Sequence, residues 1–370
     1  MKSLSPDRQK PLTLMDVARK LGVSRSTVSA AFTGNGNITA ARREAVRSAA
    51  IKLGYRPNPH AQRLANGDLD NTIALVTSYL DLDVRSQKLQ LIQRILLEKG
   101  YNASIHALGS GLISKAADSA NVISNLRRLQ PLGIVCNQWE LNEATRNELQ
   151  HFCDEGGKLV YYDVAMDLEC DQVIFDREHN SYIAMKHLLE LGHREVGFFL
   201  PPDDAARFLG VRKAMDEYGA PMRSAWINAP RQGRYEETGG HLAKYFMAQN
   251  PRPTAIVIVN DNVAIGFVAG LQRQGLRIPQ DVSVVSHNDT TAAMWGGNIQ
   301  LTSVSQPIEA IAEQTAKLLI DRLTGKYDGP PKAVHIRGEL SVRESTAKFK
   351  KRKQEANPRN AQSTFTVSQM

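Results

Sequence analysis

The sequence has few cysteines and no long hydrophobic run. Only Cys136, Cys153 and Cys170 occur among 370 residues, and no two of them form a CxxC motif. Three widely separated cysteines make neither a disulfide framework nor a metal or redox motif, so a reducing cytoplasm is the expected compartment. The first thirty residues contain no signal-peptide core, and no apolar run approaches the ~20 residues of a membrane span. We therefore expect a cytoplasmic protein without a membrane partner.

Recognisable catalytic motifs are also missing. Gly109-Ser-Gly111 follows an expected strand, but neither GxGxxG nor GxxxxGK[ST] is completed, so we expect a plain turn there. His187 and His193 lack the i,i+4 spacing of helical metal ligands, and no GxSxG elbow occurs. The sequence therefore predicts no enzyme, no cofactor and no metal site. An enzyme or a cytoplasmic small-molecule-binding protein that uses the same core remains the alternative.

The positive charge is concentrated at the two ends of the chain. Residues 1–67 carry twelve Lys or Arg against three Asp or Glu, a net charge of +9, whereas the whole chain has +8. Residues 347–370 add +5, which leaves −6 for residues 68–346. A basic first segment on an acidic body suggests that this segment alone binds a polyanion.

Residues 13–54 show the spacing of three short helices. Thr13 precedes a first apolar helical face that ends at Gly22, and Ser24 can cap a second helix. A third helix begins near Thr39 and ends at Gly54. In the second helix Val28, Ala31 and Phe32 face inward, while small polar residues and an arginine face outward. Such a narrow polar helix can enter the major groove of DNA, so the unit is expected to bind DNA.

From residue 72 onward, apolar runs alternate with amphipathic helices, which indicates an α/β fold with parallel sheets covered on both faces. The runs are TIALVT, NASIHA, LGIVC, KLVYY, QVIF, EVGFFL, TAIVIV and VSVVS. Some 275 residues of this pattern exceed one doubly wound unit, so two lobes with a cleft between them are expected. The last segment, 347–370, has no apolar periodicity and is predicted to be a disordered basic tail.

Several motifs agree in order and register with one family. They are TLMDVARKLGVSRSTVSAAF, AVRSAAIKLGYRPNPHAQRLANG, RFLGVRKAMDEYG, NDNVAIG and GLRIPQDVSVVSHNDT. Over about residues 13–346 the sequence resembles the lactose and galactose repressor (LacI/GalR) family of bacterial transcriptional regulators. The resemblance implies a dimeric, effector-controlled transcription factor, expected to be a repressor, that binds a palindromic double-stranded DNA operator. Activation instead of repression, and a tetramer instead of a dimer, stay open.

The resemblance also implies the domain organisation. A flexible extension (1–12) precedes a helix-turn-helix DNA-binding domain (13–57) and a hinge (58–68) expected to form a helix. The core (70–346) is expected to be periplasmic-binding-protein-like and to mediate effector binding and dimerisation. Its N-lobe would comprise about 70–173 and 303–331, and its C-lobe about 174–302 and 332–346. The predicted tail, 347–370, lies outside the resemblance.

The DNA-binding residues follow from the same resemblance. Arg25 and Ser26 match base-reading positions at the start of the recognition helix, while Ser24, Thr27 and Ser29 are placed for phosphates. Asn37 and Tyr55 match further DNA contacts. Many relatives carry an arginine at the position of Ala30, so operator preference cannot be copied from them.

The family's hinge residues match the proline-bounded segment of this chain. Leu64 is expected to wedge between central base steps in the minor groove. The cost of unstacking one step is offset because the bent duplex contacts more of the protein. Asn58, His60 and Ala61 would lie beside it. A leucine that only packs the linker onto the core is the alternative.

Effector contacts are expected at the strand ends that face between the lobes. Arg207 is the strongest match, as a clamp for a hydroxyl or carboxylate. Asp163, Asn260 and Asn288 match other polar contacts, and Ser86 is a weaker match. Each could instead be a structural polar residue. A saccharide is the expected effector, although Asn288 stands where sugar-binding relatives commonly have an aspartate.

Overall fold

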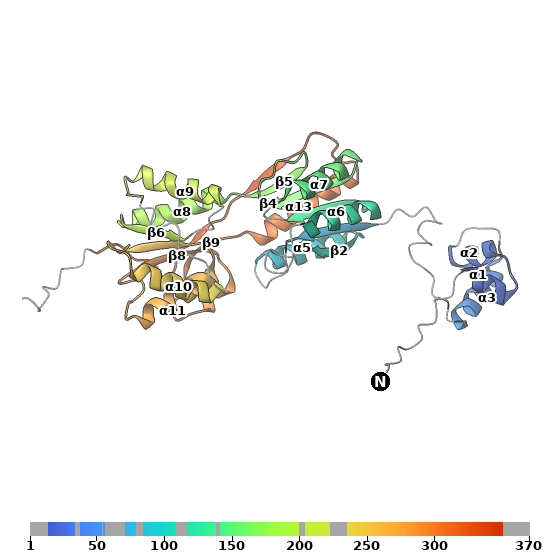
Figure 1. The fold of residues 1–370 in the computed structure, drawn as a ribbon, viewed down its shortest axis with the longest axis horizontal. Coiled ribbons are helices and arrows are strands. Elements are labelled where there is room, and N and C mark those ends of the chain that lie inside the picture. Colours follow the sequence, from blue (N-terminus) through green and yellow to red (C-terminus); the bar gives the residue numbers. More distant parts are fainter. Residues whose placement is uncertain are drawn as a thin grey trace, which may run out of the picture. The chain divides into compact units, whose positions relative to one another are not determined.

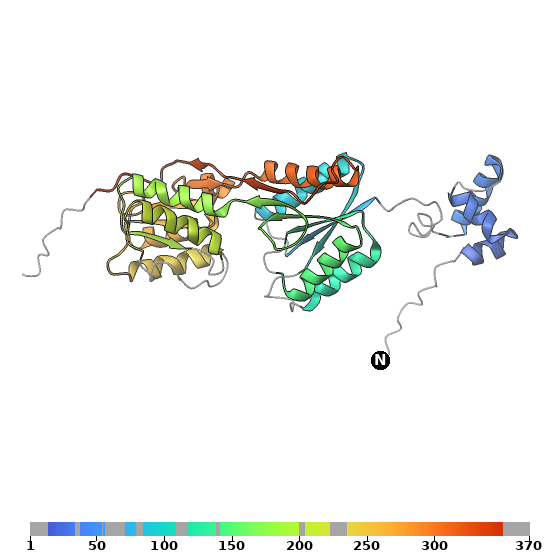
Figure 2. The same cartoon turned by 90° about the horizontal axis from the view of Figure 1, so that it is seen from above.

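The computed structural model describes nine stretches of the chain (Figure 1 and Figure 2). They are residues 14–33, 38–53, 55, 71–78, 84–108, 117–137, 141–199, 204–222 and 235–350. These residues divide into two units, each assembled from separate parts of the sequence. The first unit holds the described residues within 1–78, 96–159 and 321–327, and the second holds those within 79–95, 160–320 and 328–370.

Three short helices make up the described N-terminal part, residues 14–55, which we call the head. They are α1 (Leu14–Leu21), α2 (Arg25–Thr33) and α3 (Ala40–Lys52). Gly22 ends α1 with a φ of 61°, which glycine adopts without a Cβ penalty. Thr39 caps α3 by accepting a hydrogen bond from the Arg42 backbone N–H at 3.3 Å. The inward faces form one core of Val17, Ala18, Val28, Ala31, Val46, Ala50 and Tyr55. The three predicted helices are confirmed.

A first sheet has six strands in the order β10-β5-β4-β3-β1-β2. In chain order these are β1 (Thr72–Thr77), β2 (Asn102–Ala107), β3 (Gly133–Asn137), β4 (Lys158–Asp163), β5 (Asp171–Phe175) and β10 (Ala333–Ile336). β1 pairs in parallel with β2 and β3, and β5 pairs in parallel with β4 and β10. The associated helices are α5 (Val84–Glu98), α6 (Ala117–Leu129), α7 (Glu143–Asp154) and α13 (Ile308–Leu323).

A second sheet has five strands in the order β11-β9-β8-β7-β6. They are β6 (Val196–Phe199), β7 (Ala255–Ile258), β8 (Ser283–Asn288), β9 (Thr302–Ser305) and β11 (Leu340–Ser341), and β11 alone runs antiparallel, to β9. Helices α8 (Arg177–Glu190) and α9 (Ala205–Glu217) cover one face, and α10 (Tyr235–Met247) and α11 (Asp261–Arg273) cover the other (Figure 1). The short α12 (Thr291–Trp295) follows β8. Each face has its own apolar core.

All eight predicted apolar runs form strands, but three further strands escape the sequence pattern. β9 is buried although two of its residues are polar. Thr302 and Ser303 are 0% exposed, and hydrogen bonds of their hydroxyl groups compensate for the loss of water. β10 lies at a sheet edge and alternates between exposed and half-buried residues, so it forms no apolar run. β9 extends the second sheet, and β10 extends the first. The strand order thus places 302–305 in the second sheet, next to the boundary expected near 302/303, and places 333–336, expected in the C-lobe, in the first sheet.

The predicted tail also begins too early. The backbone N–H of Phe349 donates to the Leu191 carbonyl at 2.8 Å, and the Phe349 ring lies 5.6 Å from the His193 ring. The Ala347 backbone N–H donates to Ser283 Oγ at 3.1 Å. Ordered packing thus continues to Phe349, because a single aromatic residue and backbone hydrogen bonds suffice without any apolar periodicity. Residues 351–370 lie outside the described part.

Candidate functional sites in the head and the second unit

Ser24 caps helix α2 of the head. Its Oγ accepts a hydrogen bond from the Thr27 backbone N–H at 3.0 Å. The same oxygen lies 2.8 Å from both Ser26 Oγ and Thr27 Oγ1. Ser24 therefore has the capping role that the sequence predicts, and its phosphate contact stays a prediction.

The outer face of α2 presents the residues that the sequence assigns to base reading. Arg25 and Ser26 are exposed, whereas Val28 is 0% exposed and packs in the core of the head. Thr27 and Ser29 are half-buried at the edge of this face. A capped helix thus holds one guanidinium and one hydroxyl toward the solvent, a donor set suited to base edges in a major groove.

Tyr55 is part of the packed interior of the head. Its side chain is 8% exposed, and its ring lies 5.4 Å from the Phe32 ring at an angle of 60°. Burial raises the pKa of its hydroxyl. The structure gives this residue a packing role, and its predicted DNA contact remains untested.

The predicted contacts of the hinge and of one loop lie outside the described residues. They are Asn37, Asn58, His60, Ala61 and Leu64. Their assignments rest on the family resemblance alone and stay predictions.

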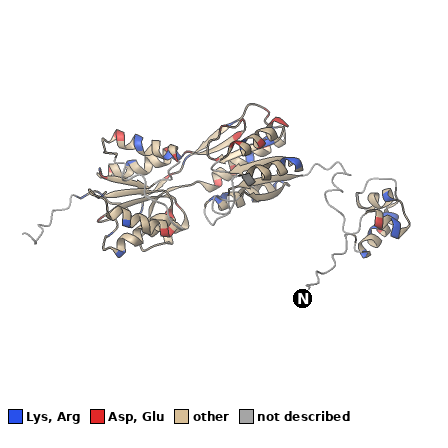
Figure 3. Cartoon of the chain, in the orientation of Figure 1, with Lys and Arg blue, Asp and Glu red and all other residues tan. Residues whose placement is uncertain are grey.

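Basic residues lie on all three helices of the head (Figure 3). The exposed basic residues are Arg19, Lys20, Arg25, Arg42, Arg47 and Lys52. The described residues of the head include only two acids, Asp16 and Glu44. The head therefore carries a positive field that attracts a polyanion.

In the second unit, Asp163 is held by a lysine that the sequence analysis overlooked. Both Asp163 carboxylate oxygens accept from Lys88 Nζ of α5, and the two residues are 6% and 1% exposed. Burial raises the pKa of Asp163, but the Lys88 charge and its hydrogen bonds outweigh burial and hold the pKa below its ordinary value. Burial lowers the pKa of Lys88 despite the nearby carboxylate. The carboxylate is thus already part of a buried ion pair.

Lys88 also connects Asp163 to Asn288. Its Nζ donates to Gln306 Oε1 at 3.0 Å, and Gln306 Nε2 donates to Asn288 Oδ1 at 2.8 Å. Asn288 ends β8 and is 8% exposed. Two of the predicted effector residues are therefore joined by a continuous polar chain whose two intermediate members were not predicted.

Arg207 is buried at the start of α9. Its guanidinium donates to Asp204 Oδ2 at 3.0 Å, and its backbone N–H donates to Asp204 Oδ1 at 3.3 Å. The side chain of Arg207 is 5% exposed. Close packing of α9 on α8 supports this position, since a Cβ on Gly210 would lie 2.0 Å from the Glu178 carbonyl oxygen.

Arg177, at the start of α8, experiences the charge of Arg207. Burial and then the Arg207 charge lower the pKa of Arg177 to about 10. His287 of β8 is 1% exposed, and burial and Arg207 hold its pKa well below its ordinary value. Arg207 therefore belongs to a group of nearby basic side chains in the second unit.

Asn260 and Ser86 occupy less distinctive positions. Asn260 caps α11, because its Oδ1 accepts from the backbone N–H groups of Asn262 at 2.8 Å and Val263 at 3.4 Å. Its φ of 141° is unusual for a residue with a Cβ. Ser86 lies in the first turn of α5 and is 9% exposed. The cap is a structural role for Asn260, and its effector contact stays a prediction.

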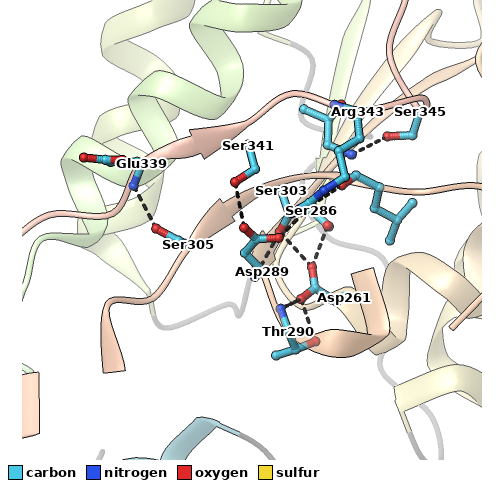
Figure 4. Close-up of polar contacts among 12 residues, drawn as sticks. Asp261, Ser286, Asp289, Thr290, Ser303, Ser305, Glu339, Ser341, Arg343 and Ser345 are labelled. Atoms are coloured by element: carbon cyan, nitrogen blue, oxygen red, sulfur yellow. Dashed lines mark hydrogen bonds and ion pairs between the residues drawn. The ribbon is translucent and has the colours of Figure 1, made fainter. Parts of the chain in front are cut away.

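The loop that follows Asn288 is anchored by two carboxylates (Figure 4). Asp261 accepts from Ser286 Oγ at 2.6 Å, from Ser303 Oγ at 2.8 Å and from the Thr290 backbone N–H at 2.8 Å. Burial raises the pKa of Asp261 to about 6, although these hydrogen bonds lower it. The network joins β8, β9 and the start of α12, and so fixes the chain around Asn288.

Asp289 anchors the other side of this loop. Its carboxylate lies 2.7 Å from a guanidinium nitrogen of Arg343 and accepts from Ser341 Oγ at 2.7 Å. The structure places Asp289 in a structural ion pair.

One signal in the sequence could have revealed Lys88. Val84, Lys88, Ile92 and Leu96 follow one another at steps of four, and each is at most 5% exposed. A lysine at an apolar helical position is rarely buried unless it is paired. Gln306 offered no comparable pattern, because its contacts with Lys88 and Asn288 join distant segments. Asp204 lies three residues before Arg207, so the i,i+3 spacing was itself a signal for their pairing.

Two family models match the chain. The model described as bacterial regulatory proteins, lacI family, matches residues 13–58, and a periplasmic binding protein-like domain matches residues 185–346. The chain thus joins a lacI-family segment to a periplasmic-binding-protein-like domain. A lacI-family protein is a DNA-binding transcriptional regulator with a ligand-binding core, so the head is its DNA-binding part.

Individual relatives agree with this family over nearly their whole length. The HTH-type transcriptional repressor PurR of Vibrio vulnificus (strain CMCP6) is 27% identical over 342 residues, which cover 91% of this chain and 99% of the relative. The transcriptional regulator CelR in complex with cellobiose has a TM-score of 0.66 and 26% identity, over 90% of this chain and 99% of CelR. The lac repressor dimer bound to operator and the anti-inducer ONPF shares the fold, with a TM-score of 0.71 and 24% identity over 91% of this chain and 100% of the repressor.

Two further findings concern the described residues alone. No described helix has the length and apolar character to cross a membrane. Within the same residues, no group of His, Cys, Asp or Glu is arranged to hold a metal ion. The lacI-family relatives named above are regulators, not enzymes.

Proposed function

We propose that this lacI-family protein is a cytoplasmic repressor that binds a palindromic operator as a dimer and is controlled by a small molecule bound in its core. The observation that carries the proposal is the capped helix α2, which exposes Arg25 and Ser26 on a head surrounded by exposed basic residues. PurR is named as a transcriptional repressor, which supports repression. The lac repressor is described as a dimer on its operator, which is the arrangement proposed here.

On DNA, Arg25 supplies the main base-specific contact. A guanidinium can donate two parallel hydrogen bonds to O6 and N7 of guanine, and such a pair discriminates against other bases by about 1–3 kcal/mol. Ser26 contacts a neighbouring base edge, and Ser24, Thr27 and Ser29 lie toward the phosphates. The exposed basic residues of the head supply sequence-independent attraction that weakens with salt.

The hinge adds a second contact in the minor groove. Leu64 wedges between central base steps, with Asn58, His60 and Ala61 beside it. Insertion unstacks a step at a cost of a few kcal/mol and bends the duplex toward more protein surface. Because two hinges must meet at the operator centre, this contact depends on how the paired cores hold them.

The effector is a saccharide or a derivative that binds near Arg207, Asp163, Asn260, Asn288 and Ser86. These residues lie at strand ends and helix starts, where ligands of parallel sheets commonly bind. The cellobiose complex of CelR and a ribose-bound lacI-family regulator from Enterococcus faecium support a sugar-type ligand. The effector changes DNA affinity only through its different affinity for two states of the core, a coupling of typically ~1–3 kcal/mol.

The first test selects DNA from a random duplex pool with the purified full-length protein, at physiological salt and with no added ligand. We expect enrichment of a palindrome with a deformable central step, and genomic matches to it would identify the regulated genes. Unpatterned binding that disappears with salt, also in the presence of a pool of metabolites, would overturn sequence-specific regulation.

The hinge is tested separately with Leu64→Ala. We expect this change to reduce binding to the selected palindrome much more than binding to unrelated DNA. Equal losses for both duplexes would contradict the minor-groove wedge and leave the role of α2 intact.

A further inference from the structure

His287 is a buried histidine whose ring has no hydrogen bond among the described residues. It is the penultimate residue of β8 and is 1% exposed. Both ring nitrogens, Nδ1 and Nε2, are buried without a partner. His193, also buried in the second unit, is fully paired: its Nδ1 lies 2.9 Å from Thr254 Oγ1, and its Nε2 lies 3.1 Å from the Ala347 carbonyl oxygen. Buried polar atoms are normally hydrogen-bonded, so the state of His287 needs an explanation.

The strand neighbours of His287 cannot satisfy its ring. Side chains alternate between the two faces of a strand, so His287 shares a face with Val285, two residues earlier. Val304 pairs with His287 in the parallel register of β8 and β9. Both valines belong to the apolar core that this face of the sheet forms with α8 and α9 (Figure 1). The residues beside His287 in this core are thus apolar and offer no hydrogen bond.

The ring lies at the end of the strand where a ligand would bind. Parallel α/β sheets bind ligands at the carboxyl ends of their strands. His287 is followed there by Asn288, which ends β8 with a φ of 100°. Arg207, in the first turn of α9, lies within electrostatic reach of His287. His287 is therefore close to two residues for which an effector contact is already proposed.

The chemistry of the ring restricts what can bind to it. A neutral imidazole carries one N–H donor and one acceptor nitrogen. Burial and then the Arg207 charge hold the pKa of His287 well below its ordinary value, so the ring is neutral near pH 7. A carboxylate or phosphate only accepts hydrogen bonds and would leave the acceptor nitrogen without a partner. A hydroxyl both donates and accepts, so two hydroxyl groups of one ligand can satisfy both nitrogens.

We propose that His287 is an effector-binding residue that exchanges hydrogen bonds with hydroxyl groups of a saccharide or another polyol at the carboxyl end of β8. This inference rests on the proposed function, because it adds a residue to the same effector site and names the groups that this residue recognises. In the ligand-free protein the unpaired ring costs stability. Effector hydroxyls remove this cost, and this gain contributes to the affinity.

The first experiment measures the thermal unfolding midpoint of the full-length protein without any added sugar. His287→Leu replaces the ring by an apolar side chain of similar size, so the midpoint should stay unchanged or rise. His193→Leu is the matched control, because it makes the same change at a buried histidine that is hydrogen-bonded through both nitrogens. Its midpoint should fall by several degrees, since buried partners lose their hydrogen bonds.

The second experiment measures sugar binding by titration calorimetry. The probes are D-glucose, D-ribose and cellobiose, each titrated into the full-length protein. We expect saturable binding of at least one probe to the wild type, and His287→Leu should weaken it about tenfold or more, because a buried sugar hydroxyl loses its partner. His287→Gln keeps one donor and one acceptor group in the side chain and should recover most of the affinity.

Three outcomes would overturn the proposal. One is a ligand-free His287→Leu protein that is destabilised as much as His193→Leu, because the ring would then have a partner in solution. The others are equal sugar affinity of His287→Leu and the wild type, and a wild type that binds none of the three sugars. Selection of a palindrome would leave the proposed regulator intact in each case. Sugar binding through His287 without sequence-specific DNA binding would count against the proposed function and not against this residue.

Discussion

Basic side chains occur in two different settings in this protein, on the surface of the head and inside the second unit. On the head, Arg25 and Arg42 are exposed and keep their hydration. In the second unit, Lys88 and Arg207 are 1% and 4% exposed and are each paired with an aspartate. An excess of positive charge on the head therefore costs little stability, whereas each buried charge is stabilised by its partner of opposite sign.

The same kind of side chain thus serves two kinds of recognition in this protein. Exposed charges act over about a Debye length, attract a polyanion and are screened by salt. Buried charges act over hydrogen-bond distances and are screened little, so they suit a small ligand that arrives in one geometry.

Removing one partner of the buried pair should have the largest effect. Lys88→Met leaves the Asp163 carboxylate buried without its ammonium partner, which typically costs about 3–5 kcal/mol. Urea unfolding followed by circular dichroism measures the loss. The double variant Lys88→Met with Asp163→Leu is the control, and it should recover most of the stability because both charges are gone. A single variant as stable as the wild type would show that the pair is not buried in solution.

The buried acid Asp261 should make the stability of the second unit depend on pH. Its pKa rises from 3.8 to about 6 on burial, so between these values the folded state holds a proton that the unfolded state has released. Its contribution is fully present below the unfolded pKa and is lost as the pH rises through about 6. A shift of this size corresponds to up to about 3 kcal/mol.

Asp261→Asn isolates this contribution, because asparagine does not titrate. We expect the variant to be less stable at every pH owing to altered hydrogen bonds, and the difference from wild type to shrink as the pH rises from 4 to 6. Unfolding free energies of both proteins across this range measure the trend. A constant difference would mean that Asp261 titrates at its ordinary value.

An exposed charge on the head should affect DNA binding and leave stability unchanged. Arg25→Ala should cost about 1–3 kcal/mol in binding to the selected operator. The unfolding free energy should change by no more than about 0.5 kcal/mol, as for other surface substitutions. Fluorescence anisotropy with specific and scrambled duplexes separates base reading from general attraction. An equal loss on both duplexes would assign Arg25 to the phosphates.

A peripheral charge of the head should show the smallest effect. Arg42→Gln removes an exposed guanidinium at the start of α3 and should lower the slope of log affinity against log salt by at most about 0.9, the value for one phosphate contact. Arg277→Gln, exposed on the second unit, should leave the slope unchanged. If Arg277→Gln lowered the slope as much, DNA attraction would not be confined to the head.

The sequence pattern predicted much of the fold because burial follows local periodicity. Val17 and Val28 sit on apolar helical faces, and the runs TIALVT and NASIHA became β1 and β2 with those boundaries. β9 was not predicted because Thr302 and Ser303 are buried polar residues, and β10 was not predicted because it lies half-exposed at a sheet edge. The periodicity of apolar residues predicts which apolar side chains are buried, and it misses a strand whose buried side chains are polar and hydrogen-bonded.

The candidate sites were predictable to different degrees. The exposed face of α2 follows from helical spacing within one short segment, so Arg25 and Ser26 could be placed from the sequence. Asp163 and Asn288 were expected near a ligand, but Lys88 and Gln306, which join them, come from positions far away in the chain. Their contacts depend on loop closure and packing, which no local pattern encodes.

Residue order and spacing along the chain were enough to predict the helical head, the alternation of strands and helices, the positive charge of the first segment and the resemblance to the lacI family. These properties follow from residue spacing and composition, which act locally along the chain. The pairing of Lys88 with Asp163 and the contacts of Asp261 with the loop after Asn288 depend on the folded structure. Such pairs form because packing of distant segments removes water from charged groups, which must then find partners within the fold.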